Sequence, residues 1–163
     1  LARTRFYFPL PLNVVFKTNT TLGFVTTPDA SPIPLFERWF MGGIYTVRGF
    51  RRNSIGEELY VGDVPDDNLR PFVIGGAKEL ILNLELEFPI FKEVRILGVG
   101  FFDAGNAWAS ADPMDPFDLE TSAGVGIRWH SPVGPLRFEW GWPLNPRPGD
   151  EPMVFEFTIG NSF

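Results

Sequence analysis

Cysteine is absent from the sequence, which excludes disulfide bonds, thiol catalysis and zinc sites built on thiolates. Long hydrophobic runs are absent as well. The longest covers only residues 97–102, whereas a membrane-spanning helix needs roughly 18 to 20 apolar residues. Positive charge is scarce, and at a net charge of −6 the chain offers no basic face for phosphates. We therefore predict no spanning helix and no nucleic-acid partner.

Catalytic and metal-binding groupings are also missing. His130 is the sole histidine, and it lies beside a turn without a serine or a metal-ligand partner at a recognisable spacing. The acidic residues at 63–68 lack the spacing and terminal Glu of an EF-hand. Glu85 and Glu87 lie two apart on one strand, but no cleft-building elements accompany this pair. We expect no enzymatic activity, no metal and no cofactor.

The sequence is rich in glycine (17), proline (16) and phenylalanine (17), and its β-branched and aromatic residues cluster in short runs between turn residues. This composition is typical of an all-β protein. Apolar and polar residues alternate in each run, as expected for strands with one apolar face. The predicted strands cover residues 3–8, 13–26, 78–88, 94–108, 120–130, 136–142 and 153–163.

The alternation assigns side chains to faces. From residue 79 to residue 88 the even positions are Leu or Phe, and the odd positions are mostly Glu or Asn, Glu85 among them. In the next strand Asp103 lies on the face opposite Phe102 and Ala104. Glu85 and Asp103 are therefore predicted to lie on the polar face of the sheet.

The connections alternate in length. Residues 9–12, 89–93 and 131–135 form short turns, whereas 27–76, 109–118 and 143–152 form long loops. Most predicted strands have about 10 to 14 residues, while strands of soluble proteins average about 5 to 6. Aromatic residues stand near the strand ends: Phe6, Phe8, Phe88, Phe91, Trp108, Trp129, Trp142 and Phe163. These features favour an antiparallel transmembrane β-barrel of the outer membrane.

A soluble β-sandwich or small barrel with a single core, such as a carbohydrate-binding domain, remains the alternative from another class. About seven strands make an odd count, whereas bacterial barrels have even numbers. The chain also begins within a strand pattern and without an initiator Met. We therefore expect residues 1–163 to be part of a larger barrel whose N-terminal strands lie outside this sequence.

The loop at 27–76 contains the segment FERWFMGGIYTVRGF at residues 36–50, and a loop this long without regular structure is expected to be functional or disordered. Its aromatic content favours packing against the sheet, and we expect four rings to be buried: Trp39, Phe40, Tyr45 and Phe50. A buried Arg48 would require fixed carboxylates on a rigid scaffold. A solvated loop arginine is the alternative.

Four segments together resemble the BamA-like superfamily of outer-membrane assembly and two-partner-secretion barrels. They are ERWFMGGIYTVRGF at 37–50, FFDAGNAW at 101–108, SAGVGIRWHSPVGPLRFEW at 122–140 and FEFTIGNSF at 155–163. The resemblance covers nearly the whole chain. It implies the C-terminal half of a barrel of about sixteen strands, preceded by periplasmic domains.

The resemblance also implies roles for particular residues. The loop motif Val47, Arg48, Gly49 and Phe50 would fold back into the barrel lumen, with Glu85 and Asp103 as the acidic partners of the arginine. The last strand resembles the sorting signal of outer-membrane proteins through Phe155, Phe157, Ile159 and the C-terminal Phe163. Gly160 would weaken the strand edge at a lateral seam, or would simply form a bend.

The function implied is assembly of other outer-membrane proteins in the bacterial outer membrane, by adding their strands to an exposed strand edge. The expected partners are unfolded outer-membrane proteins and membrane lipids, with periplasmic chaperones and accessory lipoproteins as further candidates. An export pore for one secreted protein, or the barrel of a surface-displayed enzyme, are alternatives within the superfamily.

Overall fold

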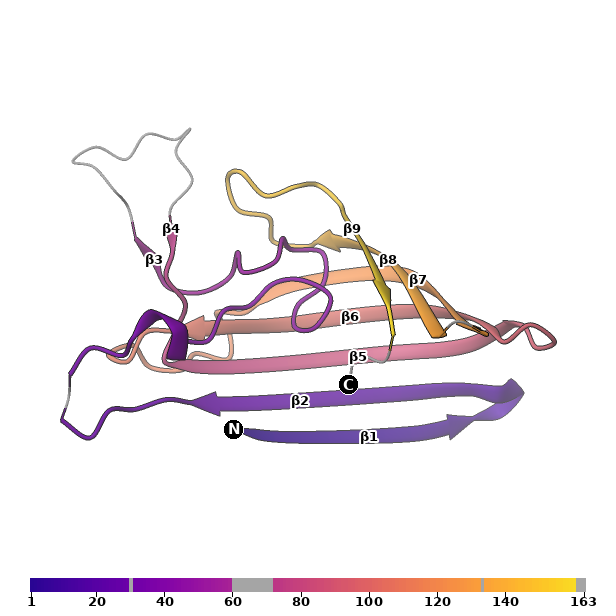
Figure 1. Cartoon of the computed structure of the whole chain (residues 1–163), viewed down its shortest axis with the longest axis horizontal. Coiled ribbons are helices and arrows are strands. Elements are labelled where there is room, and N and C mark those ends of the chain that lie inside the picture. Colours follow the sequence, from indigo (N-terminus) through magenta and orange to yellow (C-terminus); the bar gives the residue numbers. More distant parts are fainter. Residues whose placement is uncertain (30, 60–71, 133, 161–163) are drawn as a thin grey trace.

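A computed structural model describes residues 1–29, 31–59, 72–132 and 134–160. Its main element is a seven-stranded antiparallel sheet in the order β1-β2-β5-β6-β7-β8-β9 (Figure 1). Each strand pairs with the strand before it, so the sheet is a meander. Its strands are β1 (Ala2–Leu10), β2 (Val14–Phe24), β5 (Lys78–Phe91), β6 (Ile96–Trp108), β7 (Glu120–Ser131), β8 (Gly134–Pro143) and β9 (Val154–Ile159).

The connections follow the predicted alternation. At one end of the sheet the strands are joined by the 3-10 turn η1 (Pro11–Asn13), by residues 92–95, and by the turn after Ser131. At the other end lie the long connections, residues 25–77, 109–119 and 144–153. No helix in the described ranges is long and apolar enough to cross a membrane. The all-β antiparallel prediction is confirmed, and strand ends differ from it by a few residues.

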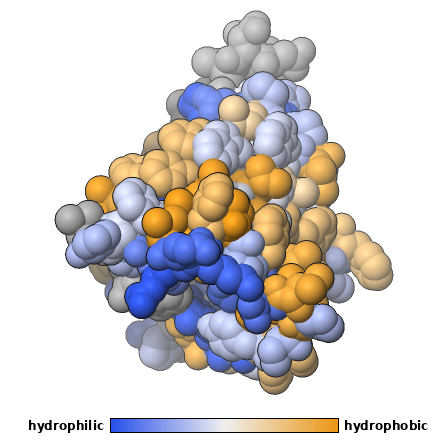
Figure 2. Space-filling model, turned by 90° about the vertical axis from the view of Figure 1, so that its right-hand side faces the viewer, coloured by the Kyte–Doolittle hydropathy of each residue, from blue (hydrophilic) through white to orange (hydrophobic). Residues whose placement is uncertain are grey.

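One face of the sheet is apolar and uncovered. The register aligns Leu84, Phe102, Ala123 and Trp142 across β5 to β8, so their side chains form a continuous band on this face. Large apolar side chains such as Val125 (52% exposed) remain accessible there. Figure 2 views the end with the short turns and shows hydrophobic residues beside and above a hydrophilic group.

The described residues place no second layer against this face, since the only other sheet is the two-residue pair β3 (Glu58–Leu59) and β4 (Phe72–Val73). A soluble sandwich would bury such a face in a core. Lipid contact accounts for it instead.

The opposite face is covered by the connection between β2 and β5 (Figure 1). Residues 38–57, called the inserted loop below, supply most of the buried apolar cluster: Met41, Val47, Phe50 and Ile55 from the loop, with Ile81 and Ala107 from the sheet. The hydrophobic core of this chain is therefore the contact between a loop and the inner face of a single sheet.

The structure corrects two expectations about residues 27–76. The segment contains regular elements, namely η2 (Leu35–Glu37), the β3–β4 pair, and isolated bridges from Trp39 to Gly76 and from Met41 to Ile55. These bridges satisfy backbone groups that a covered loop would otherwise leave unpaired. Phe50 is buried as predicted, whereas Trp39 and Phe40 are only partly buried. The prediction was wrong for Tyr45, which is 61% exposed and lines an open cavity. The acidic residues at 63–68 lie outside the described residues.

The last strand is shorter than predicted. β9 ends at Ile159, and Gly160 follows with φ of +102°, a backbone conformation that favours glycine. The Gly160 N–H still donates to the Pro135 carbonyl at 2.8 Å, so the bend stays attached to β8. Phe163 lies outside the described residues.

Candidate functional site

The tip of the inserted loop is a compact turn that directs Arg48 towards the sheet. The Gly42 N–H donates to the Thr46 hydroxyl at 2.9 Å, and the Gly43 N–H donates to the Val47 carbonyl at 3.1 Å. Val47 is fully buried next to Ile81, so the residue that precedes Arg48 is anchored in the core. The turn therefore presents the guanidinium in a fixed position.

Arg48 contacts three carboxylates, Glu85 on β5, Asp103 on β6 and Glu139 on β8, which we call the acidic cluster. Its Nε and Nη2 donate to the two oxygens of Asp103 at 2.7 Å each. Its Nη1 donates to Glu85 at 2.6 Å and to Glu139 at 3.2 Å. The Arg48 backbone N–H adds a bond of 3.0 Å to Asp103. The paired contact with Asp103 uses the fork geometry that arginine, unlike lysine, provides.

These contacts show that the sheet curves around the loop. Neighbouring strands lie about 4.8 Å apart, so β5 and β8 would be separated by about 14 Å in a flat sheet. One guanidinium nevertheless contacts acids on both of these strands. The polar face is therefore concave, which is the geometry of the inside of a barrel wall.

The site is deeply buried and its charge is balanced by direct contacts. Arg48 is 3% exposed, Asp103 0% and Glu139 1%. Burial by itself lowers the pKa of a guanidinium, but the three carboxylates raise the pKa of Arg48 above its ordinary value. The Phe101 ring also lies 3.8 Å from the guanidinium carbon. Arg48 therefore remains a cation, and it holds the loop through charge-assisted hydrogen bonds.

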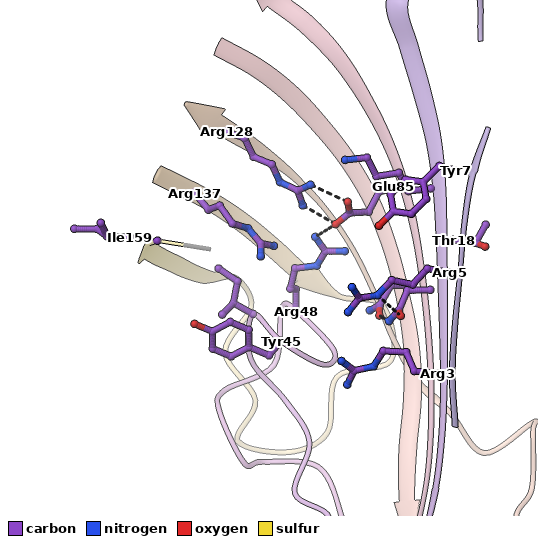
Figure 3. A pocket seen from close by; sticks show the side chains of 15 residues that line it. Arg3, Arg5, Tyr7, Thr18, Tyr45, Arg48, Glu85, Arg128, Arg137 and Ile159 are labelled. Carbon is purple, nitrogen blue, oxygen red and sulfur yellow. Dashed lines mark hydrogen bonds and ion pairs between the residues drawn. The ribbon is translucent and has the colours of Figure 1, made fainter. Parts of the chain in front are cut away.

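Two further arginines complete the network on the concave face (Figure 3). Arg128 on β7 donates to Glu85 at 2.6 and 2.9 Å and to Glu139 at 3.1 Å. Arg137 on β8 donates to Glu139 at 2.8 Å. The acidic cluster is thus shared by three cations, and only Arg48 comes from outside the sheet. Loss of Arg48 would remove the ion pairs between the loop and the acidic cluster, while Arg128 and Arg137 would still pair with Glu85 and Glu139.

Gly49 and Gly141 allow the loop backbone to lie directly against β8. A Cβ on Gly141 would stand 2.5 Å from the Gly49 nitrogen, which is closer than real Cβ contacts. Gly49 also adopts φ of +85° and would place a Cβ 3.1 Å from the Gly141 carbonyl carbon. Both positions therefore require the absence of a side chain.

A cavity of about 630 Å³ opens on the concave face beside the network. Arg5 and Lys17 line it from the side of β1 and β2, and Tyr45 lines it from the loop. Its lining contains no cluster of metal ligands, and none is found elsewhere among residues 1–29, 31–59, 72–132 and 134–160.

The structure brings Arg48 together with Glu85 and Asp103, the pair of acids expected from the sequence. The side chains of Val47 and Phe50 lie in the core between the loop and the sheet. The sequence interpretation missed Glu139, Arg128 and Arg137. Their positions on the polar faces of β7 and β8 followed from alternation, but nothing local indicated that these strands curve back to Arg48.

The residues assigned to the last strand form a separate group. Phe155 and Phe157 lie on the apolar face and pack against Trp140 and Phe138, with ring centroids 5.2 and 4.9 Å apart. Ile159 is 66% exposed, and it belongs with Gly160 to the cavity lining. None of these described residues contacts the Arg48 guanidinium through a hydrogen bond or ion pair.

Comparison with known proteins agrees with this architecture. Residues 1–163 match the Omp85 superfamily domain. The outer membrane protein assembly factor BamA of Nitratidesulfovibrio vulgaris is 34% identical over 160 residues, covering 96% of this chain and 19% of the relative. BamA of Neisseria meningitidis serogroup B is 30% identical over 158 residues, covering 80% of this chain and 19% of that relative. The chain thus spans about one fifth of the length of these relatives.

A solved structure has the same fold. The crystal structure of BamA from Haemophilus ducreyi lacking POTRA domains 1–3 superposes with a TM-score of 0.80 at 26% identity, covering 96% of this chain and 33% of that chain. These matches confirm the predicted barrel class and the predicted location in the bacterial outer membrane. This chain belongs to the Omp85 superfamily.

Proposed function

We propose that this chain is the C-terminal portion of the β-barrel of an outer-membrane assembly factor, which folds and inserts other outer-membrane proteins. The observation that carries the proposal is the similarity to two relatives named assembly factors, at 34% and 30% identity and over most of this chain. The complete barrel has about sixteen strands in this proposal, and residues 1–163 form its second half.

The inserted loop stabilises the inner wall of this barrel. Val47 and Phe50 fill the space between loop and sheet, Gly49 permits close approach to β8, and Arg48 joins the loop to Glu85 and Asp103. Since the acidic cluster draws on β5, β6 and β8, one loop fixes the relative positions of strands that do not all pair with each other. The loop thereby selects among conformations of the barrel wall.

The last strand acts on the client. β9 is the last described strand of the sheet, and in the complete barrel its outer edge meets the first strand at the seam. When the seam opens, this edge presents backbone N–H and C=O groups that an incoming strand can pair with. Phe155 and Phe157 present an apolar face that fits membrane lipid and the apolar face of a client strand, and the exposed Ile159 ends the strand beside the cavity. Phe163 completes the terminal motif, and the bend at Gly160 limits how far the edge continues.

The partners in this proposal are unfolded outer-membrane proteins and the lipids of the outer membrane, with periplasmic chaperones and accessory lipoproteins delivering or assisting clients. The role requires no cofactor and no enzymatic chemistry. The energy comes from the client itself, which exchanges unpaired backbone groups for strand pairing and buries apolar side chains in lipid.

The proposal is tested by reconstituting the intact parent protein in liposomes and adding an urea-unfolded outer-membrane protein. We expect faster formation of protease-resistant, folded client than in liposomes that contain an unrelated barrel of similar size. Equal rates in the two preparations would overturn the proposal, because the barrel would then add nothing beyond disturbance of the bilayer.

A further inference from the structure

One contact between the inserted loop and the sheet falls on the last strand. The Ile44 backbone N–H donates to Oε1 of Glu156 on β9 at 2.7 Å, between residues 112 positions apart in sequence. A Cβ on Gly43 would stand 3.3 Å from the same oxygen, so the loop backbone lies directly against this carboxylate. A third bond lies between them, since the Asn83 side-chain amide on β5 donates to the Thr46 carbonyl at 2.7 Å. The loop tip is therefore held at Ile44 by β9, at Thr46 by β5 and at Arg48 by the acidic cluster.

Glu156 is the β9 side chain suited to this role. The strand has only six residues, and its apolar side chains Phe155 and Phe157 face the other way. The other polar side chain on β9, Thr158, has a buried hydroxyl without a hydrogen-bond partner among the described residues. Glu156 also lies opposite Glu139 in the register of β8 and β9. The loop tip thus contacts adjacent carboxylates on the last two strands.

The geometry links the motion of the strand to that of the loop. The bond between the Ile44 N–H and Glu156 is half-buried, and a half-buried N–H left without an acceptor is costly. If β9 moves away from β8, it either breaks the bond to Ile44 or carries the loop tip with it. Only residues 45–47 separate Ile44 from Arg48, and the bond from Asn83 to the Thr46 carbonyl lies within this segment. Displacement of Ile44 therefore strains the Thr46 and Arg48 contacts over a short stretch of backbone.

We propose that Glu156 is a positioning residue that couples the inserted loop to the last strand, so that release of the strand edge and detachment of the loop tip occur together. This inference rests on the proposed function, in which the β9 edge receives the client. It adds that the loop tip holds β9 in place while the two are bonded, and that it is released when β9 moves. A client strand that displaces β9 would therefore also loosen the loop inside the barrel.

The test uses hydrogen exchange of the intact parent protein in lipid nanodiscs, followed at residues 42–47, 154–159 and 78–91. Glu156→Leu removes the acceptor at similar size, Glu156→Gln keeps an oxygen that can accept the same N–H, and Thr158→Val is the matched control on the same face of β9. We expect about tenfold faster exchange in both the loop tip and β9 for Glu156→Leu, with β5 unchanged. Glu156→Gln and Thr158→Val should match the wild type.

A variant on the loop side makes the test reciprocal, since coupling acts equally in both directions. Gly43→Ala strains a residue at φ of +96° and crowds the Glu156 oxygen, so it should raise exchange in residues 154–159 as well. The coupling is refuted if Glu156→Leu changes β9 alone, or if Glu156→Gln behaves like Glu156→Leu. It is also refuted if Gly43→Ala leaves β9 unchanged.

The assembly role is measured separately, with the liposome assay on the same variants. Coupled exchange in a protein that does not accelerate client folding would keep the coupling and overturn the assembly function. Accelerated client folding by a protein whose loop and β9 exchange independently would keep the assembly function and overturn the coupling. The two failures are therefore distinguishable.

Discussion

Replacing Arg48 by alanine is expected to weaken the attachment of the inserted loop to the sheet. The substitution removes four side-chain hydrogen bonds to three carboxylates. Glu85 and Glu139 keep bonds from Arg128, and Glu139 also keeps Arg137. Asp103 keeps only the backbone N–H of residue 48 among the bonds described, although it is 0% exposed.

The magnitude follows from this uncompensated buried charge. Removing one partner of a buried, hydrogen-bonded ion pair typically costs about 3 to 5 kcal/mol, because the remaining charge stays desolvated. Arg48 and Asp103 fit that case, since both are almost fully buried and joined through two parallel bonds. We therefore expect the free energy of unfolding to fall by about 3 to 5 kcal/mol. Arg48→Lys should recover only part of this, because an ammonium cannot make the paired contact.

The assay is urea unfolding of the intact parent protein in detergent micelles, followed by tryptophan fluorescence. Arg51→Ala provides the matched control, since Arg51 lies in the same loop and pairs with Glu151 on the surface. Glu151 raises the pKa of Arg51 above its ordinary value, but the pair is exposed and screened by solvent, so little change is expected. Equal effects of Arg48→Ala and Arg51→Ala would refute the argument, as would a loss below about 1 kcal/mol for Arg48→Ala.

Three further perturbations test other parts of the account. Gly141→Ala places a Cβ 2.5 Å from the Gly49 nitrogen, so it should lower the free energy of unfolding by about 1 to 3 kcal/mol in the same urea assay. Gly100→Ala is the control, because the space around its Cβ is open, and it should leave that free energy unchanged. Arg147→Ala removes bonds of 2.9 Å to Glu58 and 2.8 Å to the Ser54 carbonyl, so residues 144–153 should become more sensitive to protease; Lys92→Ala at the opposite end of the sheet should leave that cleavage unchanged. Val125→Lys puts a charge on the apolar face and should cost about 2 to 4 kcal/mol if it lies near the bilayer midplane, seen as loss of the folded band on unheated gels. Phe117→Lys, in a loop and 96% exposed, should keep that band, and an unchanged band for Val125→Lys would contradict lipid contact at this face.

Local patterns in the sequence were sufficient to place Glu85 and Asp103. Alternation has a period of two residues, so it assigns each side chain of a long strand to a face, and both acids lie on the polar face as expected. The strands themselves were recognisable for the same reason. The ends of the strands were harder to predict. In β9, for example, the sequence pattern continues past the bend at Gly160.

The curvature of the sheet could not be predicted from the alternation of side chains. Alternation places Glu139 on the polar face of its strand, but its contact with Arg48 depends on how the sheet bends over three strand spacings, which is a property of the whole barrel. The bond from Ile44 to Glu156 uses a backbone donor, and any non-proline residue provides one. Tyr45 was misassigned because aromatic character suggests burial without indicating that the loop tip borders an open cavity.

The central claim is that the last strand of this barrel receives the strands of client proteins, and a photo-crosslinker at Phe157 tests it most directly. Phe157 lies on β9 and is 47% exposed, so a probe there reaches whatever pairs with this edge in cells that express the intact parent protein. The account predicts capture of many different nascent outer-membrane proteins. It would be contradicted if nothing is captured at Phe157 while a probe at Asn83, on the concave face, traps a single secreted protein. That result would identify an export pore.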